Sequence, residues 1–401
     1  MAAPQTSGYL RTNDPTKPRS DAAVPFRDIM PSPDHPRIAG IHNHDASSWC
    51  ESRRQIEAPS WLINRLDNLE PYKGFTTDGS VRVGIYDYAE DEGAPTEEII
   101  EKVDEWIWSN PELYMNPGGL RLDECSADVQ RAIHSILKAS TSSQVYEKIL
   151  GCCRTNGFLG HLVNGRKVLN EHSYNFRLFG TPSLTSPWGY TFFGHHLCLN
   201  VVFLGKKMVI GPIFMGAEPD RIDEGPHAGL RLFRVEQLES LKLMQSLPKE
   251  LQDKATLSKG MDGKSLPADK WNPFDERHLG GARQDNRIVP YEGCPVSAFP
   301  ADKQESIIKL FKTFNEYYLQ SVLAHRLSLF KKYLNEKYFA WIGEFGDEDP
   351  YYYRIHSPVA FMELDFHCGI FLTNTTPARC HIHTVNRLPN RGDYGRALIG
   401  A

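Results

Sequence analysis

The chain lacks the patterns that mark several large classes of protein. Its 401 residues include eight cysteines, and no two of them form a Cys-x-x-Cys pair, which excludes zinc fingers and disulfide-built scaffolds. It contains no run of about 18 apolar residues, so no membrane-spanning helix is expected. Residues 1–21 lack the apolar core of a secretory signal. We therefore predict a cytoplasmic protein with reduced thiols and no membrane partner.

Charge and glycine motifs exclude further classes. The 45 basic and 50 acidic residues give a net charge of −5, and no basic field indicates nucleic acid or a lipid surface as a partner. The chain has neither of the glycine-rich phosphate-binding motifs, G-x-G-x-x-G and G-x-x-x-x-G-K-S/T, nor the G-x-S-x-G nucleophile elbow. A small-molecule substrate is the remaining expectation, and the sequence leaves the oligomeric state open.

Changes in composition along the chain predict an α+β fold. Residues 1–50 are rich in Pro, Ser, Asp and Arg and are predicted to form an extended N-terminal arm. The remainder is predicted to form one large domain, with a mixed or antiparallel sheet in its middle and C-terminal parts and helices packed around that sheet. This domain covers residues 51–401. Within it, residues 51–165 are predicted to be rich in helix and residues 172–230 rich in strands. Residues 232–338 are predicted to be helical, and residues 351–396 to form the C-terminal strands.

Several local predictions follow from the spacing of apolar residues. Repeats of three and four residues predict helices over 95–108 and 304–338. The same repeats predict a helix pair within 123–162 that ends at Asn156-Gly157, since glycine commonly follows a helix C-terminus. The alternation of apolar residues in VRVGIYDY predicts a short strand over 81–88.

Histidines gather in two segments that glycines punctuate. His195 and His196 follow a glycine and open an apolar strand, and His227 lies in a Gly-Pro-His-Ala-Gly turn. Near the C-terminus, His381 and His383 stand two positions apart on a predicted strand. Side chains two apart on a strand share a face, whereas adjacent side chains point to opposite faces. His381 and His383 are therefore expected to reach the same ligand, and His195 and His196 are not unless a bulge intervenes.

The preceding predicted strand carries Glu363, Asp365 and His367 on one face by the same alternation. If the two strands pair, imidazoles lie beside a carboxylate, and a histidine from the Gly-His-His segment supplies a third nitrogen. Such a set holds a divalent metal, with zinc first and iron or copper second, and leaves a position open for water or substrate. The predicted metal ligands are His195, His196, His381 and His383.

Catalytic roles follow from the same pattern. Glu363 is predicted to be a ligand or general base, and His227 a further catalytic residue; histidine and glutamate can also act together as acid and base without any metal. Arg387 could clamp a substrate carboxylate, or it could pair with Asp393 and brace the loop that follows. Cys198 shares a face with one histidine of the pair and offers a weaker second ligand set, although a buried cysteine is more often structural.

Several segments, in order over about residues 70–400, form one pattern: PYKGFTTDG (71–79), GAPT (93–96), FGTPSLTSPWGYTFFGHHLCLN (179–200), GPIFMGAEP (211–219), GPHAGL (225–230), YYYRIHSPVAFMEL (351–364) and HIHTVNRLPNRGDYG (381–395). Together they resemble the DUF3500 family of uncharacterised proteins. The resemblance implies a shared architecture and no established reaction. Its GHH, GPHAG and HxHxxxR motifs fall on the histidines named above and on Arg387.

These patterns predict a metal-dependent enzyme that acts on a small organic molecule by hydrolysis or another proton-transfer step. A non-haem iron or copper oxidoreductase at the same site is the first alternative, because three imidazoles suit those metals as well. The second alternative is a non-catalytic protein that binds a small molecule or a partner, in which the histidines are structural.

Overall fold

The computed structural model describes residues 25–35, 38–56, 71–86, 88, 93–94, 96, 119–271, 275–281, 284–369, 372, 374 and 376–400. The helix predicted over 95–108 lies outside these residues apart from Thr96. Residues 26–35 and 38–49, within the predicted arm, include buried side chains, among them Phe26, Ile41 and Trp49. Ile41 and Trp49 pack with Leu159 and other residues in a small apolar cluster of their own.

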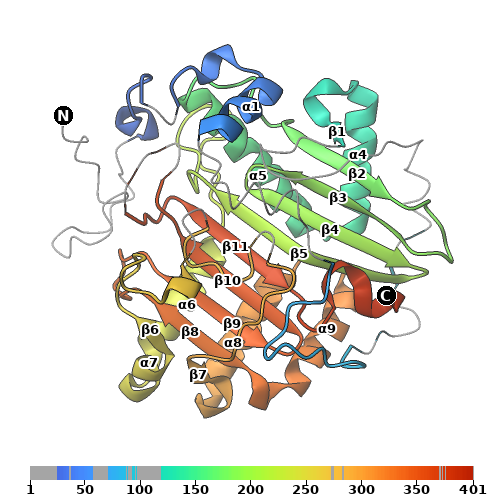
Figure 1. The fold of residues 1–401 in the computed structure, drawn as a ribbon, viewed down its shortest axis with the longest axis vertical. Helices are drawn as coiled ribbons and strands as arrows, with labels where there is room; N and C mark the ends of the chain where they lie inside the picture. Colours follow the sequence, from blue (N-terminus) through green and yellow to red (C-terminus); the bar gives the residue numbers. More distant parts are fainter. Residues whose placement is uncertain are drawn as a thin grey trace.

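The strands that the structure describes form one sheet of eleven strands (Figure 1). Their order is β1-β2-β3-β4-β5-β11-β10-β9-β8-β6, with β7 paired to β8. Among the strands named below, β6 and β8 pair in parallel and the other pairs are antiparallel. The predicted α+β fold with a mixed sheet is confirmed. The strands are β1 (Leu120–Arg121), β2 (Tyr174–Phe179), β3 (Trp188–Gly194), β4 (Leu197–Leu204), β5 (Lys207–Ala217), β6 (Thr256–Ser258), β7 (Cys294–Pro295), β8 (Tyr338–Ile342), β9 (Tyr352–Ser357), β10 (Ala360–Phe366) and β11 (Ile382–Arg387).

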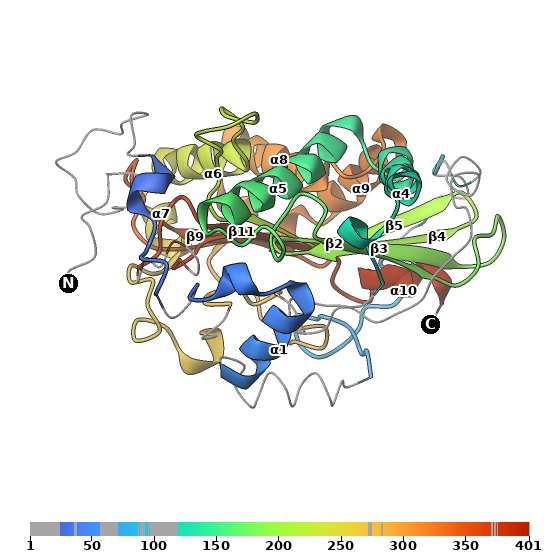
Figure 2. The same ribbon diagram turned by 90° about the horizontal axis from the view of Figure 1, so that it is seen from above.

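Helices cover one face of this sheet. Figure 2 shows α4, α5, α6, α8 and α9 on one side, with α1 and the described part of the segment between β6 and β7 on the other. The sheet is thus covered by a helical layer on one side and by a largely irregular layer on the other. The helices are α1 (Ala46–Ile56), α4 (Ala127–Ser140), α5 (Ser143–Leu162), α6 (Arg234–Ser246), α7 (Lys249–Ala255), α8 (Ala301–Asn315), α9 (Gln320–Lys332) and α10 (Arg396–Ile399).

The two faces of the sheet differ in chemistry because successive strand residues point to opposite sides. On β10, Met362, Leu364 and Phe366 belong to the main apolar core. Glu363 and Asp365 alternate with them and are fully buried. Asp365 lies opposite His383 of β11, and residues directly opposite in a ladder share a face. The polar face therefore collects the ionisable groups that the core face excludes.

The predicted end of the helix pair at Asn156-Gly157 is wrong, because α5 continues to Leu162. Its glycines serve close packing instead of termination. A Cβ on Gly160 would lie 1.9 Å from the carbonyl oxygen of Leu169, and one on Gly157 would lie 2.8 Å from the Glu171 side chain. Glycine here lets the following segment lie against the helix surface.

The single helix predicted over 304–338 is also wrong, because the structure divides this stretch into α8 and α9. Side chains replace the lost helical partners at the break. Asn315 Nδ2 donates to the carbonyl oxygen of Phe311 at 2.9 Å. Asn386 Nδ2, from β11, donates to that of Phe314 at 2.9 Å. Helix-terminal carbonyls satisfied in this way need no continuing helix.

The strand predicted over 81–88 is absent over the described residues 81–86, which form turns and irregular backbone. Gly84 has φ of +70°, a left-handed conformation that interrupts an extended strand. Val83 is consequently 93% exposed, so the alternation of apolar residues here does not line a buried face.

Candidate metal centre

The Gly-His-His segment forms the tight turn between β3 and β4. Gly194 pairs with Leu197 across the hairpin, so His195 and His196 are its two loop residues. His196 adopts φ of +60°, a left-handed conformation that a non-glycine residue occupies at a cost of about 1–3 kcal/mol. The prediction that both histidines open a strand is therefore corrected: the turn frees them from strand alternation and directs the His196 ring toward β11.

Three imidazoles from distant parts of the chain meet at this turn. His196 and His383, 187 positions apart, bring their Nε2 atoms to 3.1 Å. His381 Nε2 lies 3.3 Å from His196 Nε2 and 3.0 Å from His383 Nε2. With metal–nitrogen bonds of about 2.0–2.1 Å, neighbouring nitrogens lie roughly 3.3–3.4 Å apart in a tetrahedral site and roughly 2.9–3.0 Å apart in an octahedral one. The observed triangle matches one face of either polyhedron.

The protonation of these rings favours a cation at their centre. His381 Nδ1 donates to the carbonyl oxygen of Cys368 at 2.6 Å, so the Nε2 of the neutral ring carries a lone pair. Burial lowers the pKa of His381, and it lowers the pKa of His196 and His383 well below its usual value. Neutral imidazoles cannot satisfy three mutual contacts with the few ring protons available, whereas one metal ion accepts all three lone pairs.

Gly216 of β5 makes room for two of these rings. It pairs with His383 in the β5–β11 ladder. A Cβ on it would lie 2.9 Å from Cδ2 of His196 and 3.0 Å from Cδ2 of His383. The absent side chain at this position lets the two imidazoles approach each other.

Gly216→Ala is therefore expected to separate the imidazoles and weaken metal binding at least tenfold. It should also lower the free energy of unfolding by about 1–3 kcal/mol through overpacking, because the new methyl group would lie 2.7 Å from the carbonyl oxygen of Ile382. Metal titration and chemical denaturation of the purified variant measure the two effects separately. Unchanged metal affinity would show that Gly216 does not position the rings.

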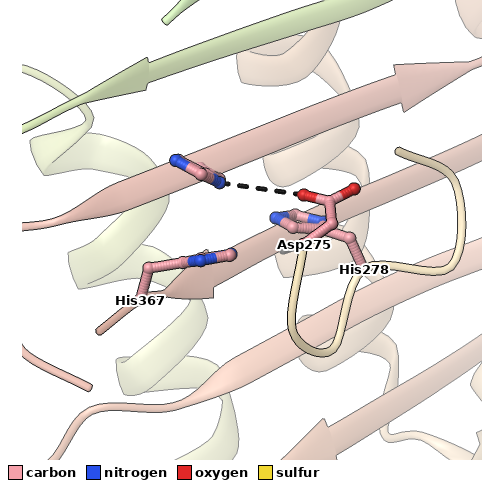
Figure 3. A group of neighbouring side chains, drawn as sticks. Asp275, His278 and His367 are labelled. Carbon is pink, nitrogen blue, oxygen red and sulfur yellow. Dashed lines mark ion pairs between the residues drawn. The ribbon is translucent and has the colours of Figure 1, made fainter. Parts of the chain in front are cut away.

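A second cluster adjoins the first (Figure 3). Asp275 and His278, on the loop 275–281, approach His367 and His383, and one donor atom from each lies within 4.8 Å of the others. Asp275 Oδ1 lies 3.9 Å from His383 Nδ1. His278 and His367 are almost fully buried, whereas the Asp275 side chain is 22% exposed. Asp275 is thus the member of this cluster that reaches solvent.

Glu363 holds the loop 275–281 against the sheet. Its oxygens accept hydrogen bonds from the backbone N–H of Leu279 at 2.8 Å and of Gly280 at 2.9 Å, and from the Tyr352 hydroxyl at 2.5 Å. His278 Nδ1 lies 3.3 Å from Glu363 Oε2. The carboxylate is therefore occupied as an anchor and orients the His278 ring, a position typical of a residue behind a metal ligand.

The charges of this region favour a cation. Burial disfavours a charged His278, but the carboxylates of Asp275, Glu363 and Asp365 outweigh it and raise the pKa of His278 to about 9. Arg277 donates from Nε to Asp365 Oδ1 at 2.8 Å and also pairs with Glu276. Glu276, Asp365 and His367 form a third group of donor atoms, in which Arg277 already supplies positive charge.

The structure places the other predicted site residues outside the three-histidine group. His195 Nδ1 lies 2.9 Å from Asn156 Oδ1, and its ring packs on that of His196 at 3.8 Å between centroids. His227 lies near the surface, 3.3 Å from Glu171. His195 is therefore a neighbour of the three-histidine group, whereas His227 contacts Glu171 outside that group.

Arg387 is buried and serves as a brace. It pairs with Asp393 at 3.0 Å and with Asp285 at 2.8 Å, and it donates to the carbonyl oxygens of Gly280 at 2.5 Å and Gly281 at 3.2 Å. Of the two roles that the sequence left open for Arg387, this geometry matches the pairing with Asp393. By fixing Gly280 and Gly281, Arg387 helps to hold the loop that carries Asp275.

Sequence reasoning missed Asp275 and His278. They lie in the long polar stretch between β6 and β7, where no periodicity assigns a direction to a side chain. The available signal was the i, i+3 spacing of an aspartate and a histidine, followed at once by Gly280-Gly281 in DERHLGG. Long loops of this kind are often functional.

Comparison with known proteins finds one family. A family model described as "Protein of unknown function (DUF3500)" matches residues 91–396. No curated protein and no solved structure matches the chain. In the part of the chain that the structure describes, no helix combines the length and apolar character needed to cross a bilayer.

Proposed function

The chain belongs to the DUF3500 family, whose description assigns no activity, and we propose from its geometry that it is a metal-dependent hydrolase for a small organic molecule. The ion, zinc in the first instance, is held by His196, His381 and His383. The observation that carries this proposal is the convergence of their three Nε2 atoms at 3.0–3.3 Å. The His381 Nδ1–H bond to Cys368, which leaves the Nε2 lone pair directed inward, supports it.

The donor set and its surroundings determine the chemistry proposed. A divalent metal on three neutral imidazoles lowers the pKa of a bound water toward about 7 and polarises a carbonyl group. The Asp275 carboxylate lies on the Nδ1 side of the His383 ring and is partly open to solvent, so we assign it the acceptance of a proton from water in the space beside that ring. Glu363 and Arg387 fix the loop that carries Asp275 and act as positioning residues.

The experiment combines metal analysis with turnover. The purified chain is analysed for bound metal by mass spectrometry and incubated with a panel of small esters, lactones and amides. Chelation is expected to abolish hydrolysis, and added zinc to restore it. Asp275→Asn should lower kcat by about 10²–10⁴-fold, the usual contribution of a proton-transferring side chain. Hydrolysis that persists in metal-free protein would exclude the proposal.

One observation supports an oxidoreductase as the second candidate. The three-histidine group offers nitrogen donors alone, and such sets also bind copper and iron. Comparison of turnover with and without oxygen separates the two reactions, because metal-assisted hydrolysis needs no oxidant. Loss of activity under anaerobic conditions in the iron- or copper-loaded chain would favour the oxidoreductase.

A further inference from the structure

We infer that the chain binds a second divalent cation beside the first, at Asp275, His278 and His367, and that His383 bridges the two ions through its two ring nitrogens. This inference rests on the proposed function, because it requires that the three-histidine group holds an ion. It adds a metal site, makes the centre dinuclear and gives Asp275 a further role.

The position of the His383 ring supports the bridge. Its Nε2 faces His196 and His381 at 3.1 and 3.0 Å. Its Nδ1 faces the other way, 3.9 Å from Asp275 Oδ1. This Nδ1 is buried and makes no hydrogen bond with the residues that the structure describes. A buried ring nitrogen without a partner is costly unless an ion or water satisfies it.

His278 presents a second nitrogen of the same kind. Its Nδ1 is directed at Glu363, while its buried Nε2 has no hydrogen-bond partner among the described residues. The His278 and His383 rings are nearly parallel, with 22° between their planes and 5.8 Å between their centroids. His367 lies with them, 3.9 Å from His383 and 5.4 Å from His278 between ring centroids. The three rings and the Asp275 carboxylate thus enclose one small space.

The position of the Asp275 carboxylate also depends on the absence of a side chain at Gly281. A Cβ on Gly281 would lie 1.6 Å from Asp275 Oδ2, so this carboxylate occupies space that only glycine leaves free. Oδ1 is then the oxygen directed at His383. In the dinuclear centre, Asp275 binds the second ion through one oxygen and keeps the other for a proton.

Net charge favours the same conclusion. The loop 275–281 and β10 together carry four carboxylates, Asp275, Glu276, Glu363 and Asp365, against the single guanidinium of Arg277. Divalent cations are commonly bound where buried carboxylates exceed the positive charge around them. Binding at both ring nitrogens of His383 releases its remaining ring proton to solvent, so the bridging ring carries a negative charge between the two ions.

The test counts zinc in single-site variants. Each protein is equilibrated with zinc, passed through a desalting column and analysed by mass spectrometry. Two zinc ions per chain are expected in the wild type. One is expected in His196→Ala, which removes a ligand of the first site, and one in His278→Ala, which removes a ligand of the second.

Gly281→Ala and His172→Ala complete the set. Gly281→Ala displaces Asp275 without removing any donor and should lower second-site affinity at least tenfold, so it provides the answer if His278→Ala does not fold. His172 is exposed, and His172→Ala should keep both ions. One ion in the wild type, retained in His278→Ala and lost in His196→Ala, would overturn the second site while the proposed function stands. A wild type without any bound ion would overturn both.

Copper tests the bridge itself. With two Cu²⁺ ions joined through one imidazole, the electron paramagnetic resonance signal of the wild type should fall well below that of two isolated ions at low temperature, because their spins couple. His278→Ala loaded with one Cu²⁺ should give full intensity for a single ion. Full intensity for two isolated ions in the wild type would show that His383 does not bridge them.

Discussion

His381→Ala is expected to lower the affinity of the chain for zinc by more than about 100-fold. His381 is fully buried, and its Nε2 lies 3.0 Å and 3.3 Å from the other two nitrogens of the group. Loss of a residue that only orients a metal ligand already reduces affinity by about 10–100-fold, so loss of a ligand should exceed this range. A zinc titration against a chromophoric chelator measures the change.

Two further variants make this result specific. His381→Asn keeps an amide in place of the ring and reports whether a smaller polar group preserves folding, which circular dichroism verifies. His172→Ala removes an exposed histidine and should leave zinc affinity within twofold of the wild type. A folded His381→Ala protein with wild-type zinc affinity would remove the three-histidine group as the metal site.

The largest expected loss of stability follows from Arg277→Met. The Arg277 and Asp365 side chains are both fully buried and pair at 2.8 Å. Arg277 also donates to the carbonyl oxygen of Phe366 at 2.7 Å and to that of Met261. Removing one partner of a buried ion pair leaves an uncompensated charge and costs about 3–5 kcal/mol. Urea denaturation of the metal-free protein should show a decrease of this size in the free energy of unfolding.

A surface pair provides the control. Arg131 also pairs with an aspartate, Asp128, but both side chains are largely exposed, at 71% and 86%. Exposed pairs contribute about 0–1 kcal/mol, so Arg131→Ala should change stability by less than 1 kcal/mol. If Arg277→Met were no more damaging than Arg131→Ala, the charge at Asp365 would have to be balanced by other groups.

Part of this centre could be derived from residue order because strand alternation is a local property. The spacing of two brings His381, which immediately precedes β11, and His383, on β11, to the same place, with their Nε2 atoms 3.0 Å apart. The same period of two places Glu363 and Asp365 on one face of β10. The pairing of these strands, in which Asp365 lies opposite His383, then brings imidazole and carboxylate together as predicted. The two helices within 123–162 were likewise predictable, because their apolar spacing is local.

The rest depended on contacts between residues far apart in the chain, which no local period encodes. His196 rather than His195 joins the group because His196 adopts a left-handed backbone conformation in the turn between β3 and β4. Its ring reaches His383 of β11 across β5, where Gly216 has no side chain to block the approach. Asp275 and His278 reach the site because Glu363 binds the backbone of their loop from 83–84 positions away. Residue order thus established which side chains share a strand face, whereas packing of loops and turns onto that face established which of them meet.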